Sequence, residues 1–110
     1  MEARLKTAIW VTGTLRRAQS AGCFGAVVRR GDEDAGGVIL VMRGRAGLVV
    51  LSQTRDQQGG MAWLKATGPD PVDEEKSDAY ITRATGRDPD LWVVEIETPD
   101  FTACFEGKIL

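Results

Sequence analysis

The spacing of apolar residues near the start of the chain predicts an amphipathic helix over residues 5–18. The positions that fall within one half of a helical wheel are Leu5, Ala8, Ile9, Val11, Leu15 and Ala18. We expect the helix to end at Ala21 and Gly22, with Gly22 as its C-terminal cap. The β-branched residues and the glycine between positions 7 and 13 fit a strand nearly as well, so both structures stay open for the first half of this element.

Four short apolar runs follow, and each is closed by a loop or turn that contains glycine. They cover residues 24–30, 37–42, 48–54 and 61–67. Short glycine-bearing loops between apolar runs are typical of successive β-hairpins. Pro69 and Pro71 follow the fourth run and end it, because proline cannot donate to a strand ladder. The pattern therefore predicts a four-stranded antiparallel meander.

A second helix and a last strand complete the pattern. Asp70 is suited to cap a helix that has Pro71 at its first position, runs to about Thr85 and is stopped by Gly86. Residues 91–97 then alternate, with Trp92, Val94 and Ile96 on one face. The sequence predicts one α+β domain of residues 1–110: an N-terminal helix, the meander, a helix and a final strand. The helices pack on one mainly antiparallel sheet, whose exception is the partner of the last strand after its helical crossover.

The second and third predicted strands are apolar on both faces. An antiparallel sheet with one face in water would alternate more strictly between apolar and polar residues. Either the two helices cover opposite faces of the sheet, or a second copy of the protein buries one face. The second explanation predicts a homodimer.

Trp10 supports the homodimer, because it lies off the predicted apolar stripe, between Lys6 and Arg17. An exposed tryptophan beside cations is suited to anchor an interface, and the candidate interface residues are Trp10, Arg17 and Trp63. The alternative is that the C-terminal residues 101–110 cover Trp10 within one chain.

The composition limits the chemistry more than it suggests any. The chain has 110 residues, of which 43% are hydrophobic and 27% charged, as in an ordinary soluble domain. It has no histidine, which excludes Ser-His-Asp and Cys-His catalysis and histidine ligands to zinc. Cys23 and Cys104 each adjoin a phenylalanine, a setting typical of buried free thiols, so we expect both to be reduced in a cytoplasmic protein. A single disulfide between them is the alternative.

No membrane association is expected from the sequence. The longest apolar run, residues 38–42, is far shorter than the roughly 20 residues that cross a bilayer. The N-terminal residues also lack the pattern of a secretory signal peptide.

Charge divides the chain into a basic and an acidic half. Residues 1–55 hold 9 Lys/Arg against 4 Asp/Glu, whereas residues 56–110 hold 5 against 12. Arginines of the first half form a candidate basic patch: Arg16, Arg29, Arg30, Arg43 and Arg45. Such a patch would suit nucleic acid, but the pI near 5.1 and the lack of an RNA-binding motif make nucleic-acid binding the less favoured alternative.

The sequence gives no support for a cofactor or a metal. No phosphate-binding glycine motif lies between a strand and a helix, and the acidic residues 32–34 lack the glutamate that a calcium loop needs, because Arg43 occupies its position. Three polar residues near the end of one hairpin, Gln53, Arg55 and Lys65, are suited to bind a small anion. The same residues could instead catalyse a reaction of such an anion. An ordinary polar rim explains the same residues.

Several spaced motifs resemble one protein family. They are residues 51–56 (LSQTRD), 62–69 (AWLKATGP), 78–81 (DAYI) and 88–95 (DPDLWVVE), with Arg4-Leu5-Lys6, Ile9-Trp10-Val11 and Arg16-Arg17 at the start. The chain resembles, over nearly its whole length, a family of small bacterial proteins known only as a domain of unknown function. The resemblance implies a bacterial cytoplasmic protein and no activity, ligand or catalytic residue. From the two-sided apolar strands and Trp10, we expect a non-enzymatic, self-associating binding or adaptor module.

Overall fold

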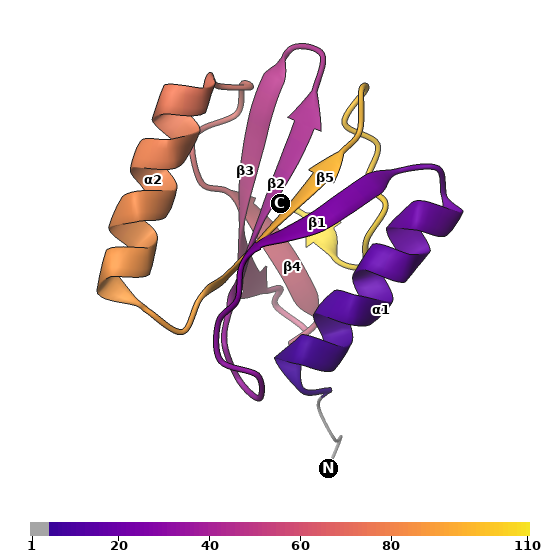
Figure 1. The fold of residues 1–110 in the computed structure, drawn as a ribbon, viewed down its shortest axis with the longest axis vertical. Helices are drawn as coiled ribbons and strands as arrows, with labels where there is room; N and C mark the ends of the chain where they lie inside the picture. Colours follow the sequence, from indigo (N-terminus) through magenta and orange to yellow (C-terminus); the bar gives the residue numbers. More distant parts are fainter. Residues whose placement is uncertain (1–4) are drawn as a thin grey trace.

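The computed structural model describes residues 5–110, which form one six-stranded sheet between two helices (Figure 1). The elements in chain order are α1 (Thr7–Ser20), β1 (Phe24–Arg29), β2 (Val38–Gly44), β3 (Gly47–Arg55), β4 (Met61–Lys65), α2 (Glu74–Arg87), β5 (Trp92–Glu97) and β6 (Lys108–Ile109). The α+β class, both helices and five of the strands are as predicted from the sequence, and the first element is helical from Thr7 onward. The two-residue strand β6 was not predicted.

The sheet is mixed, with the strand order β1-β5-β2-β3-β4-β6. β5 lies between β1 and β2, so the predicted first hairpin of the meander is wrong. β5 pairs antiparallel with β1 and parallel with β2, and β6 pairs parallel with β4. The connection through α2 allows the parallel pairing, and Trp92, Val93 and Val94 are all buried, as expected of a central strand.

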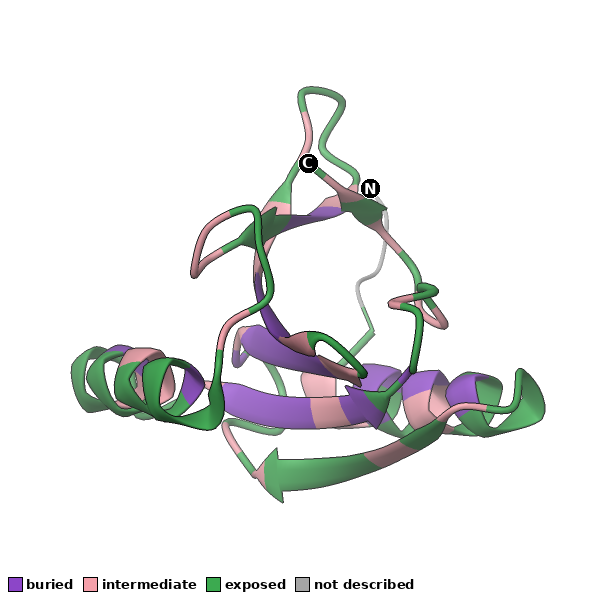
Figure 2. Ribbon diagram, turned by 90° about the horizontal axis from the view of Figure 1, so that it is seen from above, coloured by how far each residue is buried: buried purple, intermediate pink, exposed green. Residues whose placement is uncertain are grey.

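The sheet has an apolar core on each face, because each helix covers a different face. On one face, α1 packs against alternate residues such as Leu40, Val94 and Trp63. On the other face, α2 packs against the intervening residues, including Val41 and Val50. Figure 2 shows the central strands as buried between the helices. The first of our two explanations for the two-sided strands therefore holds, and these strands need no second copy to be covered.

The buried face of α1 is rotated from the predicted stripe. The buried residues of the helix are Trp10, Val11, Thr14 and Ala18. Leu5 and Ile9, predicted to face the core, are 64% and 55% exposed. The predicted stripe is wrong at these positions because C-terminal residues pack over Trp10 and add a second apolar surface beside the sheet.

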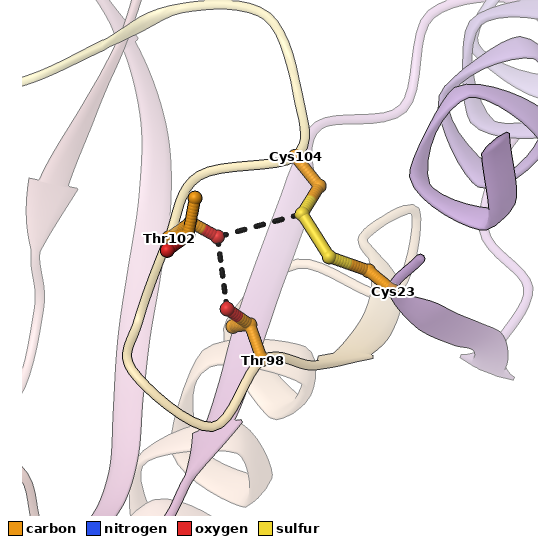
Figure 3. Close-up of a disulfide and its surroundings, with 4 residues drawn as sticks. All are labelled: Cys23, Thr98, Thr102 and Cys104. Carbon is orange, nitrogen blue, oxygen red and sulfur yellow. Dashed lines mark hydrogen bonds between the residues drawn. A yellow bond between two sulfur atoms is a disulfide. The ribbon is translucent and has the colours of Figure 1, made fainter. Parts of the chain in front are cut away.

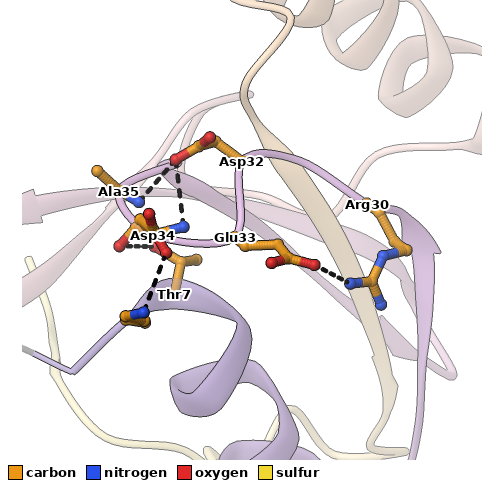
Figure 4. Close-up of polar contacts among 7 residues, drawn as sticks. Thr7, Arg30, Asp32, Glu33, Asp34 and Ala35 are labelled. Carbon is orange, nitrogen blue, oxygen red and sulfur yellow. Dashed lines mark hydrogen bonds and ion pairs between the residues drawn. The ribbon is translucent and has the colours of Figure 1, made fainter.

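The acidic loop between β1 and β2 holds the start of α1 (Figure 4). The helix has no side-chain cap at Lys6. Instead, the amides of Thr7 and Ala8 donate to the carbonyls of Asp34 and Glu33, at 3.2 and 2.9 Å. The Asp32 carboxylate accepts from two amides of the same loop. The two carbonyls satisfy amides that a helix start leaves free, and the Asp32 carboxylate stabilises the loop that presents them.

α2 begins later than the sequence indicated. Its N-cap is Asp73, whose carboxylate accepts from the Lys76 amide at 2.9 Å, so the prediction of Asp70 as the cap is wrong. Val72 is extended and exchanges two hydrogen bonds of 2.8 Å with Leu48. This bridge to β3 keeps the chain out of the helix until Asp73. The helix then continues through Gly86 to Arg87.

Cys23 and Cys104 form a disulfide, so the prediction of two free thiols is wrong (Figure 3). The bond joins the chain just before β1 to the C-terminal segment, across 81 positions of sequence. The Thr102 carbonyl accepts from the Thr98 hydroxyl at 3.0 Å in the turn that leads to Cys104. Both cysteines are half-buried beside the core, in the apolar surroundings that the sequence indicated. They are bonded to each other rather than reduced. The prediction of a cytoplasmic location loses the support that it drew from free thiols.

Candidate functional site

The residues proposed to hold an anion, Gln53, Arg55 and Lys65, are not gathered at one point. Lys65 pairs with Leu51, and Arg55 pairs with Met61 at the other end of the β3–β4 ladder. Four ladder positions separate them, or roughly 13 Å. The Gln53 side chain is engaged, because its carbonyl oxygen accepts from the Val38 amide at 3.1 Å.

Arg55 instead lines an open hollow with residues of the β3–β4 turn and of the C-terminal segment. The hollow has a volume of about 420 Å³. Its lining residues are Arg55, Asp56, Gln57, Gln58, Lys108 and Leu110. Sequence reasoning missed Lys108, because the pairing of β6 with β4 brings it here and a two-residue strand has no recognisable pattern.

The tryptophans of the candidate interface are core residues. Trp63 is completely buried and Trp10 is 7% exposed, with their ring centroids 6.0 Å apart. Both indole N–H groups donate to Glu106, Trp63 to its carbonyl at 2.9 Å and Trp10 to its carboxylate at 3.4 Å. The C-terminal segment therefore covers Trp10, as in the second explanation above, and an exposed tryptophan anchor is wrong. Arg17 is exposed and donates to the hydroxyl of Thr14.

The five arginines of the candidate basic patch do not converge. Arg29 and Arg43 are separated by four positions along the central strands, or roughly 13 Å. Arg16 belongs to α1, whereas Arg43 contacts α2 on the opposite face. Arg30 and Arg45 pair with the carboxylates of nearby acids.

Several of these arginines also have structural partners. Arg29 donates to the carbonyls of Pro89 and Leu91, at 3.0 and 2.6 Å. The Arg30 guanidinium lies 5.0 Å from the centroid of the Trp92 ring. This arrangement gives no support to nucleic-acid binding.

Arg43 connects α2 to the sheet. Its guanidinium donates to the Glu95 carboxylate of β5 at 3.0 Å and forms an ion pair with Glu74 in the first turn of α2. Hydrogen bonds to Glu95 and then to Glu74 raise the pKa of Arg43 above its ordinary value. Glu95 is half-buried within this network.

β1 presents an apolar surface that sequence reasoning did not single out. It is the edge strand of the sheet, and within residues 5–110 no strand pairs with its outer side. Phe24, Val27 and Val28 are 69%, 37% and 63% exposed. Figure 2 shows β1 as almost entirely exposed beside the buried central strands. The signal in the sequence was the pair Val27 and Val28. The position of this strand at the edge of the sheet depends on where β5 inserts.

No helix in residues 5–110 is long and apolar enough to cross a membrane. Within the same range, no group of three or more cysteine, aspartate or glutamate side chains is arranged to hold a metal ion.

Comparison with known proteins identifies the family. The family model described as "Protein of unknown function (DUF1491)" matches residues 5–106. The chain belongs to the DUF1491 family. No curated protein matches it.

Solved structures show the same fold, and two of them are of DUF1491 family proteins. A crystal structure of a DUF1491 family protein from Caulobacter crescentus CB15 is 33% identical, with a TM-score of 0.84, covering 97% of this chain and 100% of that one. An NMR structure of a DUF1491 family protein from the same organism has the same identity and TM-score and covers 99% of both chains. The solution structure of protein Atu0922 from A. tumefaciens is 27% identical, with a TM-score of 0.76, covering 94% and 93%. The DUF1491 assignment gives this chain a fold and a family but no activity.

Proposed function

We propose that this DUF1491 protein is a non-enzymatic binding module that associates with a second copy of itself through β1. The observation that carries the proposal is an unpaired edge strand whose apolar side chains are exposed. An edge strand presents free backbone N–H and C=O groups, which a further strand can pair. Proteins usually protect such edges with lysine, proline or very short strands. β1 has six residues and neither lysine nor proline, and its protection is a bulge at Val28.

The exposed apolar residues of β1 have no cover within the described chain. Phe24 and Ala26 pair with Glu97 and Glu95, which places them on the same face of the sheet as α2. That helix packs over β2, β3 and Val93 and does not reach Phe24. A partner strand added to β1 would bury its exposed apolar side chains as well as its backbone groups.

Charge and symmetry favour a second copy as the partner. Arg30 lies exposed just beyond one end of β1, and Glu97 is exposed beside its other end. Two copies of β1 joined antiparallel by a two-fold axis would place the basic end of each beside the acidic end of the other. With the axis at Ala26, Phe24 of one copy would lie opposite Val28 of its partner, so the two most exposed large apolar residues of the strand would cover each other.

Sedimentation velocity over a wide range of concentrations tests this dimer. Because pairing of two six-residue strands makes a small interface, we expect a dimer that dissociates on dilution. Val28→Lys and Phe24→Lys should each make the protein monomeric at every concentration, because they place a charge on the paired edge. Leu64→Lys is the matched control, since Leu64 is an exposed apolar residue on β4, at 48%.

Two results would overturn the proposal. The first is a wild-type protein that stays monomeric at all concentrations. The second is a dimer that survives Val28→Lys and is lost with Leu64→Lys, which would locate the association at the opposite edge. Circular dichroism of each variant confirms that the fold is retained.

A further inference from the structure

We propose that the hollow between the β3–β4 turn and β6 is a binding site for a small anion that carries a phosphate group. Its volume of about 420 Å³ lies in the range of small-molecule sites. It lies beside β4 and β6, at the sheet edge opposite β1, and is therefore separate from the proposed dimer edge.

Two cations without a carboxylate partner line this hollow. Neither Arg55 nor Lys108 forms an ion pair with a carboxylate of residues 5–110. Among the described residues, Lys6, Arg30, Arg43 and Arg45 do form such pairs, whereas other cations, such as Lys65 and Lys76, do not. The two uncompensated charges come from β3 and β6, so only the folded sheet brings them to one place.

The turn holds Arg55 in position for a ligand. One guanidinium N–H donates to the Gly59 carbonyl at 2.8 Å, which leaves the other donors of the group available. A guanidinium fixed in this way loses less conformational entropy on binding than a free one. A planar group of donors, in a hollow that Lys108 also lines, matches the several acceptor oxygens of a phosphate.

The one side-chain carboxylate in the lining, that of Asp56, is committed to the turn. Its Oδ1 accepts from the amides of Gln58 and Gly60, at 2.9 and 2.8 Å. These bonds disperse its charge and keep the turn rigid. The side-chain amides of Gln57 and Gln58 add neutral donors, and Leu110 adds an apolar wall that would suit an organic group attached to the phosphate.

Titration with inorganic phosphate and with phenyl phosphate, followed by amide chemical shifts, tests the site. We expect saturable shifts confined to residues 55–60 and 108–110, with tighter binding of phenyl phosphate. Lys108→Gln should weaken binding about fivefold, the factor expected for one exposed charge pair. Lys76→Gln, which removes an exposed cation on α2, should leave the affinity unchanged.

The remaining variants separate binding from folding. Arg55→Lys keeps the charge but loses the planar group, and should also weaken binding. Shifts spread over other basic surfaces, or equal affinity in Lys108→Gln and the wild type, would overturn the proposal. Equal binding of succinate would replace phosphate by carboxylate as the ligand class and would overturn it too. Val28→Lys should bind phosphate normally, so failure of the dimer and failure of this site are distinguishable.

Discussion

Replacement of Gly107 by alanine tests how tightly the C-terminal segment holds the core. Gly107 has a φ of +108°, which side chains rarely adopt. A Cβ at this position would lie 2.5 Å from Nε1 of Trp63 and 2.9 Å from its Cδ1. Trp63 cannot move aside easily, because it is completely buried between Trp10 and Phe105. The methyl group must therefore displace the segment or the indole.

Two contributions give the expected magnitude. Alanine at this φ costs about 1–3 kcal/mol of backbone strain. Crowding of a packed core costs about 1–3 kcal/mol more, and displacement of the segment would instead break the bond from Trp63 to Glu106, at a similar cost. We expect Gly107→Ala to lower the free energy of unfolding by about 3 kcal/mol, a large part of the roughly 5–15 kcal/mol typical of a domain.

Urea unfolding followed by tryptophan fluorescence and circular dichroism measures this change, and two glycines provide controls. Gly59 has a φ of +81° but open space around its Cα, so Gly59→Ala reports the backbone cost alone, about 1 kcal/mol. Gly86 lies inside α2 with open space around it, and Gly86→Ala should stabilise by about 0.5–1 kcal/mol. If Gly107→Ala and Gly59→Ala lose the same stability, the contact with Trp63 that we describe is refuted.

Three further predictions concern the start of α2 and the cysteines. Asp73→Ala should cost about 1 kcal/mol in urea unfolding because it removes the N-cap, whereas Asp70→Ala should cost nothing measurable; the reverse order would mean that the helix begins earlier. A double-mutant cycle of Arg43→Met and Glu74→Gln should give a coupling energy of about 0.5 kcal/mol, since both side chains are partly exposed, and additive losses would show that the pair does not stabilise the fold. Alkylation of the denatured, unreduced protein should modify neither cysteine, and modification of both would show that the disulfide is absent.

The elements with a local pattern could be predicted from the sequence, and the features that depend on distant pairing could not. Residue spacing predicts a helix over residues 5–18, close to the observed α1, although it leaves a strand open for the first half, and it predicts the alternation of Trp92, Val94 and Ile96. The insertion of β5 beside β1 depends on contacts between residues far apart in the chain, for which hairpin-like loops gave the wrong neighbour.

The placement of the candidate site residues could not be predicted for the same reason. Trp10 was expected to be exposed because a helical wheel shows only the helix itself, and the C-terminal residues that cover it have no recognisable periodicity. The partnership of Cys23 with Cys104 needs their Cα atoms to meet, which spacing alone does not reveal. Lys108 joined the Arg55 hollow through a strand too short to detect.

The central place of β5 sets the order in which the protein can assemble during its synthesis. β1 and β2 leave the ribosome early, but the strand that separates them is made only after α2. Until then, β1 has no neighbouring strand and β2 can pair on one side only. The unpaired edges of these apolar strands therefore stay open to other nascent chains. Such delayed closure slows folding and favours aggregation. The emerging chain should therefore depend on chaperones that bind extended apolar segments until residues 92–97 have been translated.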